Sequence, residues 1–256
     1  MCLVNFHFQE HPVYKLIVVA NRDEFYERPT AAAGFWKDYP GILAGRDLVH
    51  MGTWLGVTRD GRFAALTNYR DPNEAKGRFS RGDIVRDFLA NGEASVDFIQ
   101  TLAKNKGKYG GFNVVIGDGN QLFHYNNILD EMNEIPPGTH SLSNHTLNTP
   151  WPKVAKGKKQ LGDYVRSCPA EVQIDSLFDI ISDQTAAEDQ HLPNTGVGLE
   201  MERLLSPLFI KSPNYGTRSS TVLLMDKENH ITFVERTFHE GVFQTEKRFE
   251  FKIGDI

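Results

Sequence analysis

KLIVVANRDEF, residues 15–25, is the stretch of sequence that decides the fold. Residues 16–20 are apolar without alternation, which is typical of a strand that is covered on both faces inside a layered structure. Residues 2–8 alternate in polarity and predict an earlier strand, with a turn at His11-Pro12 between the two. We therefore expect the chain to begin with a hairpin whose interior is buried.

The rest of the chain predicts more strands and several helices around this hairpin. Residues 80–92, SRGDIVRDFLANG, predict a helix with Ser80 as its N-cap and a stop at Gly92. Strands linked by hairpin turns and covered by helices are typical of an α+β fold with largely antiparallel sheets. No repeat or linker divides the chain, so we expect residues 1–256 to form one domain. The other expected strands are 53–59, 63–68, 113–117, 121–125, 220–226, 230–236 and 245–252, and helices are expected over about 94–104 and within 152–205.

Composition excludes several classes of protein. The net charge is −5, and the lysines and arginines are scattered, so we expect no nucleic-acid partner. No apolar run approaches the roughly twenty residues that a membrane-spanning helix needs, and the first residues lack a secretory pattern. Two cysteines, Cys2 and Cys168, form no disulfide framework, and no zinc-type spacing of Cys and His occurs. We therefore expect a cytoplasmic protein without a bound metal.

Cys2 is the first candidate for chemistry. If residue 1 is removed, Cys2 carries both a thiol, with an unperturbed pKa near ~8.5, and an α-amine, with a pKa near ~7.7 to 8.0. The amine could then act as the base that activates the thiol of the same residue. The alternative is that Cys2 is a small apolar residue that happens to lie early in the chain.

Charged residues follow the buried strand and form the second candidate group. Arg22, Asp23 and Glu24 arrive where the hairpin would bring them beside Cys2. An arginine there could lower the thiol pKa or bind a substrate carboxylate, and an aspartate could orient the α-amine. The alternative is a structural ion pair that closes the strand end.

Three polar residues at other predicted strand ends complete the candidate site. Asn68 and Asn144 could provide donors to an oxyanion, although asparagine at such places also forms turns. Arg218 comes directly before a strand and could anchor an anionic substrate, or serve as a cap or an ion-pair partner.

Several motifs occur in one order along most of the chain and resemble a known family, the NRDE family, also called the TANGO2 (transport and Golgi organisation 2) family. The resemblance implies a four-layer αββα sandwich of the N-terminal nucleophile hydrolase type, in which two antiparallel sheets lie between helical layers. The motifs are the MC start, ANRDEF (20–25), GTWLG (52–56), ALTNY (65–69), LSN (142–144), TPWPK (149–153) and YGTR (215–218).

Cysteine amidases of this fold, of the bile-salt hydrolase and penicillin V acylase type, suggest a role for each candidate. The resemblance implies that Cys2 is the nucleophile, that Asn68 and Asn144 flank the oxyanion, and that Arg218 is the late arginine of the site. The amidases separate their arginine and aspartate by two residues, whereas Arg22 and Asp23 are adjacent. Asn21, Asp23 and Glu24 therefore all remain candidates for contacting Cys2.

Two functional hypotheses follow, from different classes. The leading one is a hydrolase that cleaves a linear amide C–N bond in a small-molecule substrate and needs no cofactor. The alternative is a non-catalytic carrier that binds heme or an acyl thioester or other lipid in the same pocket, because members of the family are linked to heme trafficking and lipid metabolism. A third possibility is an inherited scaffold in which these residues only stabilise the hairpin.

Overall fold

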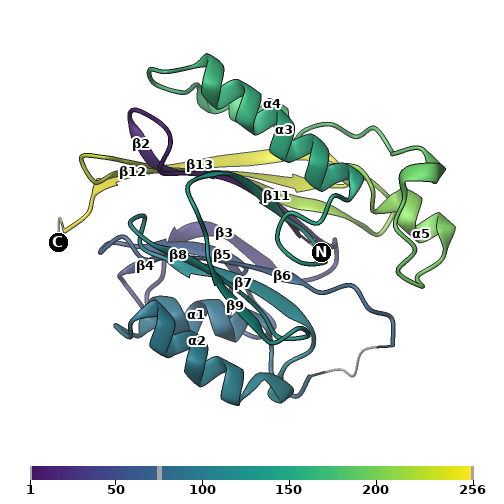
Figure 1. Cartoon of the computed structure of the whole chain (residues 1–256), viewed down its shortest axis with the longest axis horizontal. Helices are drawn as coiled ribbons and strands as arrows, with labels where there is room; N and C mark the ends of the chain where they lie inside the picture. Colours follow the sequence, from purple (N-terminus) through teal and green to yellow (C-terminus); the bar gives the residue numbers. More distant parts are fainter. Residues whose placement is uncertain (1, 74–76, 255–256) are drawn as a thin grey trace.

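Two β-sheets lie face to face between two layers of helices (Figure 1). The structure is a computed structural model that describes residues 2–73 and 77–254. Neighbouring strands in both sheets are antiparallel. This four-layer αββα sandwich confirms the expected α+β fold class.

The first sheet contains the predicted N-terminal hairpin. β1 (Cys2–Phe8) and β2 (Tyr14–Phe25) pair with Cys2 opposite Arg22 and Phe8 opposite Leu16. β11 (Tyr215–Asp226) lies on the other side of β2, although about 190 residues separate them in the sequence. The strands in spatial order are β10 (Gly138–Leu142), β1 (Cys2–Phe8), β2 (Tyr14–Phe25), β11 (Tyr215–Asp226), β12 (His230–His239) and β13 (Val242–Lys252).

The second sheet follows the order of the sequence, because each strand pairs with the next one. Its outer face is covered by α1 (Gly82–Ala90) and α2 (Ser95–Lys104), whose apolar faces pack on the strands around Phe88 and Phe112. The strands are β3 (Thr30–Phe35), β4 (Ile42–Asp47), β5 (Leu55–Thr58), β6 (Phe63–Asn68), β7 (Phe112–Gly117), β8 (Leu122–Asn126) and β9 (Glu131–Glu134).

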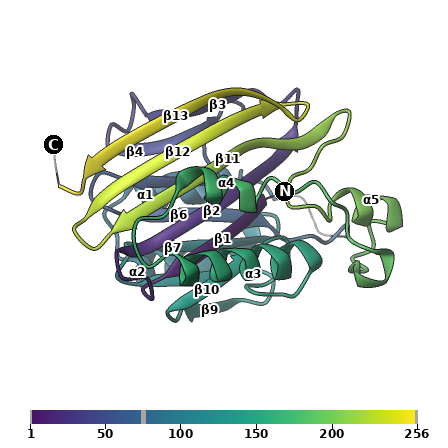
Figure 2. The ribbon, with the colours of Figure 1, turned by 90° about the horizontal axis from the view of Figure 1, so that it is seen from above.

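Helices α3 (Pro152–Ser167) and α4 (Ile174–Ile180) cover the outer face of the first sheet, and α3 lies over β1 and β10 (Figure 2). Ile17 and Val19 of β2 pack under these helices, whereas Leu16 and Val18 pack between the sheets. Residues 16–20 are therefore covered on both faces, as their apolar run predicts. The remaining helical pieces are α5 (Leu199–Leu204) and two 3-10 turns, η1 (Lys106–Lys108) and η2 (Asp189–His191).

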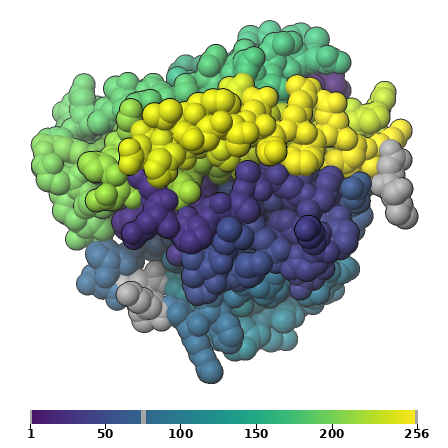
Figure 3. Space-filling view, turned by 180° about the vertical axis from the view of Figure 1, so that it is seen from behind, coloured from purple at the N-terminus to yellow at the C-terminus, as the bar shows by residue number. Residues whose placement is uncertain are grey.

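One edge of the sandwich is closed by aromatic contacts between the sheets. Phe35 of β3 contacts Phe249 and Phe251 of β13, with ring centroids 6.0 and 5.7 Å apart. Figure 3 shows this face, where the yellow C-terminal strand lies against the purple segment that contains β3. The contacts keep the first and last thirds of the chain together.

The structure also differs from the sequence-based expectations. The helix expected from Ser80 begins at Gly82, after Arg81, and no side chain caps it, although the Ser80 Oγ accepts a hydrogen bond of 3.3 Å from the Gly82 N–H. β3, β4 and β9 were not predicted from the sequence, and of β10 only the strand end before Asn144 was indicated. In the described ranges, no helix has the length and apolar composition to cross a membrane.

Candidate active site

A pocket of about 560 Å³ lies where β1 begins and where β2 and β6 end. Its lining includes most of the candidate side chains from the sequence, namely Cys2, Arg22, Asp23, Glu24 and Asn68, but not Asn144 or Arg218. The hairpin and the pairing of the two sheets bring together residues from opposite layers of the sandwich. Apolar lining comes from Trp54, Leu66, Tyr69, Phe79 and Val197.

Cys2 is the first residue of β1 and is partly buried. The Oγ of Ser143 donates a hydrogen bond of 3.0 Å to the Cys2 carbonyl, which fixes this end of the strand. Burial raises the pKa of the Cys2 thiol, and the charge of Asp23 adds to this effect, whereas Arg22 opposes it. A positive group near the thiol is therefore needed if Cys2 is to ionise near neutral pH.

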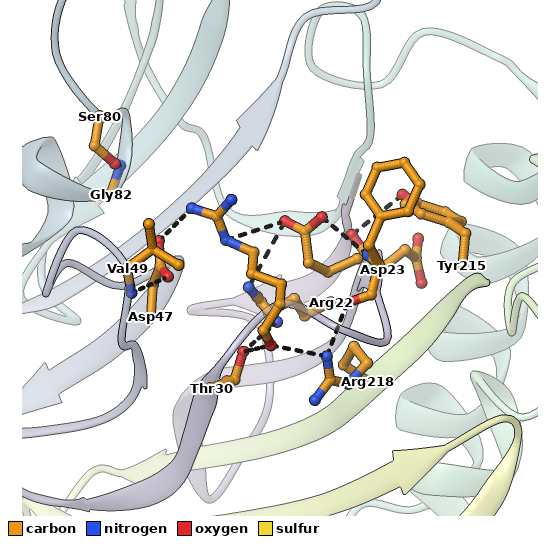
Figure 4. Close-up of polar contacts among 12 residues, drawn as sticks. Arg22, Asp23, Thr30, Asp47, Val49, Ser80, Gly82, Tyr215 and Arg218 are labelled. Carbon is orange, nitrogen blue, oxygen red and sulfur yellow. Dashed lines mark hydrogen bonds and ion pairs between the residues drawn. The ribbon is translucent and has the colours of Figure 1, made fainter.

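Arg22 and Asp23 are adjacent on β2, so their side chains point to opposite faces of the sheet. Arg22 faces the second sheet, where its guanidinium stacks 4.3 Å from the Trp54 ring centroid and donates to the Thr30 Oγ1 at 3.2 Å. Asp23 is buried on the helix side and accepts a hydrogen bond of 2.8 Å from the Thr217 Oγ1. Figure 4 shows Arg22 beside Thr30 and Asp23 beside Tyr215.

The environments of Asn21, Asp23 and Glu24 separate the three candidates for contacting Cys2. The Asn21 Nδ2 donates to the carbonyls of Ile181 and Leu208, both at 2.8 Å, so this amide is bonded to the segments that follow α4 and α5. Glu24 pairs with Arg22 and Arg28, with N–O distances of 3.7 Å. Asp23 is the acidic residue whose charge and backbone N–H both act on the thiol.

The two asparagines occupy different layers of the site. Asn68 ends β6 and lines the pocket. Asn144 is fully buried, and its Nδ2 donates a hydrogen bond of 3.0 Å to the Asn68 carbonyl, while its Oδ1 accepts from the Ser143 Oγ. Asn144 thus holds Asn68 in place from behind rather than lining the pocket itself.

Arg218 is not brought to the thiol. It lies at an irregularity of β11, between Thr217 and Ser219. Its Nη1 donates to the carbonyls of Phe25, Tyr26 and Arg28, at 2.8, 2.9 and 3.1 Å, and it lines a separate cavity of about 190 Å³. Arg218 therefore secures the loop after β2, and the capping alternative describes its position better than substrate anchoring.

The sequence did not indicate two charged residues of this region, Arg70 in the pocket lining and the buried Lys153. Arg70 forms a buried ion pair with Glu202, with 2.5 Å between Nη1 and Oε2, and stacks over Trp151. Lys153 lies in the first turn of α3 and is 2% exposed. A signal for Lys153 exists in the sequence: it lies four residues before Gly157 and eight before Leu161, on the buried face of the helix.

No group of three His, Cys, Asp or Glu side chains is arranged to hold a metal ion among residues 2–73 and 77–254. His50 lines the pocket that contains Cys2. The buried histidines His7, His11, His124 and His140 instead form hydrogen bonds within the protein.

The fold is a sandwich of the N-terminal nucleophile hydrolase type. Two solved structures of the conjugated bile acid hydrolase from Clostridium perfringens, each of a different variant, have this fold. The C2A mutant superposes with a TM-score of 0.55 over 98% of this chain and 97% of that chain, and the second variant with 0.54 over 99% and 98%. Each is 8% identical in sequence, so the likeness shows a shared fold.

The chain belongs to the Transport and Golgi organisation 2 family, whose model matches residues 1–240. The transport and Golgi organization protein 2 homologs of Bos taurus and Homo sapiens are each 35% identical to it, over 93% of this chain and 93% of the relative. The Drosophila melanogaster protein is 28% identical over 93% and 92%. The resemblance seen in the motifs is therefore confirmed for both family and fold.

Proposed function

We propose that this protein is a cytoplasmic hydrolase that cleaves a linear amide C–N bond of a small molecule, with the thiol of Cys2 as nucleophile. The observation that carries the proposal is the pocket at the start of β1, in which Cys2 lies beside Arg22, Asp23 and Asn68. A thiol, an acidic group, a cation and an amide donor are the parts that acyl transfer to a cysteine requires.

In this mechanism residue 1 is first removed, once, which exposes the α-amine of Cys2 before any turnover takes place. This amine takes the thiol proton, the sulfur attacks the amide carbonyl, and the amine returns the proton to the leaving nitrogen. Water then hydrolyses the thioester and releases the acid. Asp23 orients the α-ammonium from the buried side, and Arg22 stabilises the thiolate from the opposite face.

We assign stabilisation of the oxyanion to the side-chain amide of Asn68. The backbone N–H groups that follow it are already used, because Tyr69 donates to the Gly111 carbonyl at 2.9 Å and Arg70 to the Asn144 carbonyl at 2.7 Å. Asn144 then has a supporting role, since its amide fixes the end of β6 on which Asn68 lies. The sequence resemblance implies that Asn144 flanks the oxyanion together with Asn68; we propose instead that Asn144 supports Asn68.

A search for the covalent intermediate tests the proposal directly. The purified protein is incubated with a library of linear N-acyl amides, and intact mass and peptide mapping report an acyl group on Cys2 and loss of residue 1. We expect an acyl-Cys2 adduct and release of the amine in the wild-type protein and in Cys168→Ser, and neither in Cys2→Ser. Cys168 is a matched control because it is also free and partly buried but lies after α3.

The carrier alternative is the other outcome of this experiment. If no compound acylates Cys2 and the Cys2→Ser variant retains a compound as well as the wild-type protein does, the pocket binds without reaction and the amidase proposal fails. A heme carrier would find one histidine, His50, in the lining, and arginines such as Arg28 and Arg81 for its carboxylates.

A further inference from the structure

Lys153 occupies an unfavourable position for a lysine. It is 2% exposed, and its Nζ has no hydrogen-bond partner within residues 2–73 and 77–254. It also follows Pro152 in the first turn of α3, where the helix dipole disfavours a positive charge. Burial, the lack of an acceptor and the helix end all oppose a lysine here, so fold stability does not account for this residue.

The packing of α3 over β1 places Lys153 behind the thiol. A Cβ built on Gly157 would lie 2.5 Å from the Asn5 side chain, and one built on Gly162 would lie 3.1 Å from Thr139, which pairs with His7. Moving along α3 toward its N-terminus therefore moves along β1 toward Cys2. Lys153 is one turn before Gly157, and its neighbour Val154 packs against Leu3.

The charged groups around Lys153 come from four elements. Asp23 of β2 and the Cys2 thiol of β1 attract its ammonium, as does Glu202 of α5, whereas Arg70 after β6 repels it. Glu202 and Arg70 neutralise each other in a direct ion pair. Lys153 is therefore left with two attractive groups, the Asp23 carboxylate and the ionised thiol, and adds its positive charge to that of Arg22, which also acts on both of them.

We propose that Lys153 is a positioning residue of this site, whose buried ammonium favours the thiolate of Cys2 and the carboxylate of Asp23. The inference deepens the proposed function and rests on Cys2 as its nucleophile. Arg22 approaches the thiol from the space between the sheets and Lys153 from the helix side, so the two cations act from opposite faces of the first sheet. Burial lowers the pKa of Lys153 to about 8, and the amine is still mostly charged at pH 7.

The test measures ionisation of the thiol without any amide substrate. Alkylation of Cys2 by iodoacetamide is followed by peptide mass from pH 6 to 10, and the midpoint of the rate profile gives the thiol pKa. The key variant is Lys153→Met, which removes the charge and keeps an unbranched side chain of similar length. Lys156→Met is the matched control, because Lys156 is on the same helix but pairs with Asp183 near the surface.

We expect Lys153→Met to raise the midpoint by at least one unit, which corresponds to alkylation about tenfold slower at pH 7. Its thermal stability should stay equal to or above that of the wild-type protein, because a buried charge without an acceptor has been removed. Lys156→Met should leave the midpoint unchanged, and Lys153→Arg, which keeps the charge, should also retain it.

A folded Lys153→Met protein with the wild-type midpoint overturns the proposal, as does an equal shift in Lys156→Met. If Lys153→Met does not fold, Lys153→Arg decides the question. This variant keeps the positive charge, so a rise of one unit in its alkylation midpoint contradicts the role of that charge. The readout separates this inference from the proposed function. A protein without amidase activity can still show the shifted alkylation midpoint in Lys153→Met. An active amidase without this shift would refute only the role of Lys153.

Discussion

Individual side chains at the pocket divide into those that line it and those that hold the lining in place. Cys2, Arg22, Asp23 and Asn68 belong to the first group, and Asn144 and Ser143 to the second. Ser143 links the two halves of the site, because its Oγ lies 3.0 Å from both the Cys2 carbonyl and the Asn144 Oδ1. Movement of one asparagine would therefore disturb the nucleophile as well.

This division predicts different consequences for the two asparagines. Asn68→Ala removes the proposed oxyanion donor from a partly exposed position, so turnover of the amide found in the screen should fall about 10²- to 10³-fold with little loss of stability. Asn144→Ala leaves buried polar atoms without their partner and should lower the free energy of unfolding by about 1–3 kcal/mol. Turnover and thermal melts of both variants make the comparison.

The reverse pattern would contradict these roles. If Asn144→Ala abolished turnover at unchanged stability and Asn68→Ala were fully active, Asn144 would be the oxyanion donor after all. Asn126→Ala is a suitable control for loss of a buried asparagine, because Asn126 is fully buried in β8 and does not line the pocket.

Among the helices and strands, the packing of α3 on the first sheet positions Lys153 and depends on close approach at Gly157. The backbone of α3 at this point lies against the Asn5 side chain, which itself accepts a hydrogen bond of 2.7 Å from the Ser141 Oγ. A Cβ at residue 157 would lie 2.5 Å from the Asn5 Oδ1. The glycine is therefore required by contact with β1 and not by the conformation of the helix.

Gly157→Ala consequently tests the packing of α3. Alanine normally favours a helix over glycine by about 1 kcal/mol, but overpacking against a buried side chain costs about 1–3 kcal/mol. We expect a net loss of stability and slower alkylation of Cys2, because α3 must shift away from β1. Denaturant unfolding measures the first effect and iodoacetamide labelling the second.

Gly41→Ala is the control, since a Cβ there meets nothing within 4 Å. It should change the free energy of unfolding by no more than about 0.5 kcal/mol. An increase in stability for Gly157→Ala would show that helix propensity outweighs the contact with Asn5.

The sequence predicted some of these elements well and others not at all. Residues 16–20 were predicted correctly because a strand buried on both faces has a continuous apolar run. β3, TAAAGF, was missed because alanine and glycine do not favour strands, and β9, EMNE, because both of its faces are exposed at the sheet edge. Such strands form because their neighbours provide pairing partners, which the local sequence does not reveal.

The candidate site shows the same limit. The sequence correctly predicted that Arg22 lies beside Cys2, because the register of a hairpin follows from its two neighbouring strands. The position of Arg218 could not be predicted, because a guanidinium before a strand can bind either a substrate or the backbone carbonyls of a loop. Which of the two it binds depends on the path of the loop after β2, which the local sequence does not reveal. Lys153 was missed because its proximity to Cys2 arises from the docking of a helix about 150 residues later in the chain.

The two sheets together form the core, and a buried acid connects them. Glu235 of β12 is 1% exposed, and its Oε1 accepts a hydrogen bond of 2.6 Å from the Ala33 N–H of β3. Burial between the sheets raises the pKa of Glu235 from 4.5 to about 7. In the folded protein this side chain therefore keeps its proton over a pH range in which it ionises in the unfolded chain.

This difference makes the stability of the sandwich depend on pH. Below pH 4.5 Glu235 is protonated in both states and has no effect, between pH 4.5 and 7 stability falls as pH rises, and above pH 7 the full cost of about 3 kcal/mol is present. Glu235→Gln keeps the acceptor for Ala33 but cannot ionise. We expect it to match the wild-type free energy of unfolding near pH 4.5 and to exceed it at pH 8. Glu250→Gln, at an exposed position of β13, is the control and should follow the wild-type curve of unfolding free energy at every pH. A Glu235→Gln curve that runs parallel to the wild-type curve from pH 4.5 to 8 would contradict the raised pKa of Glu235.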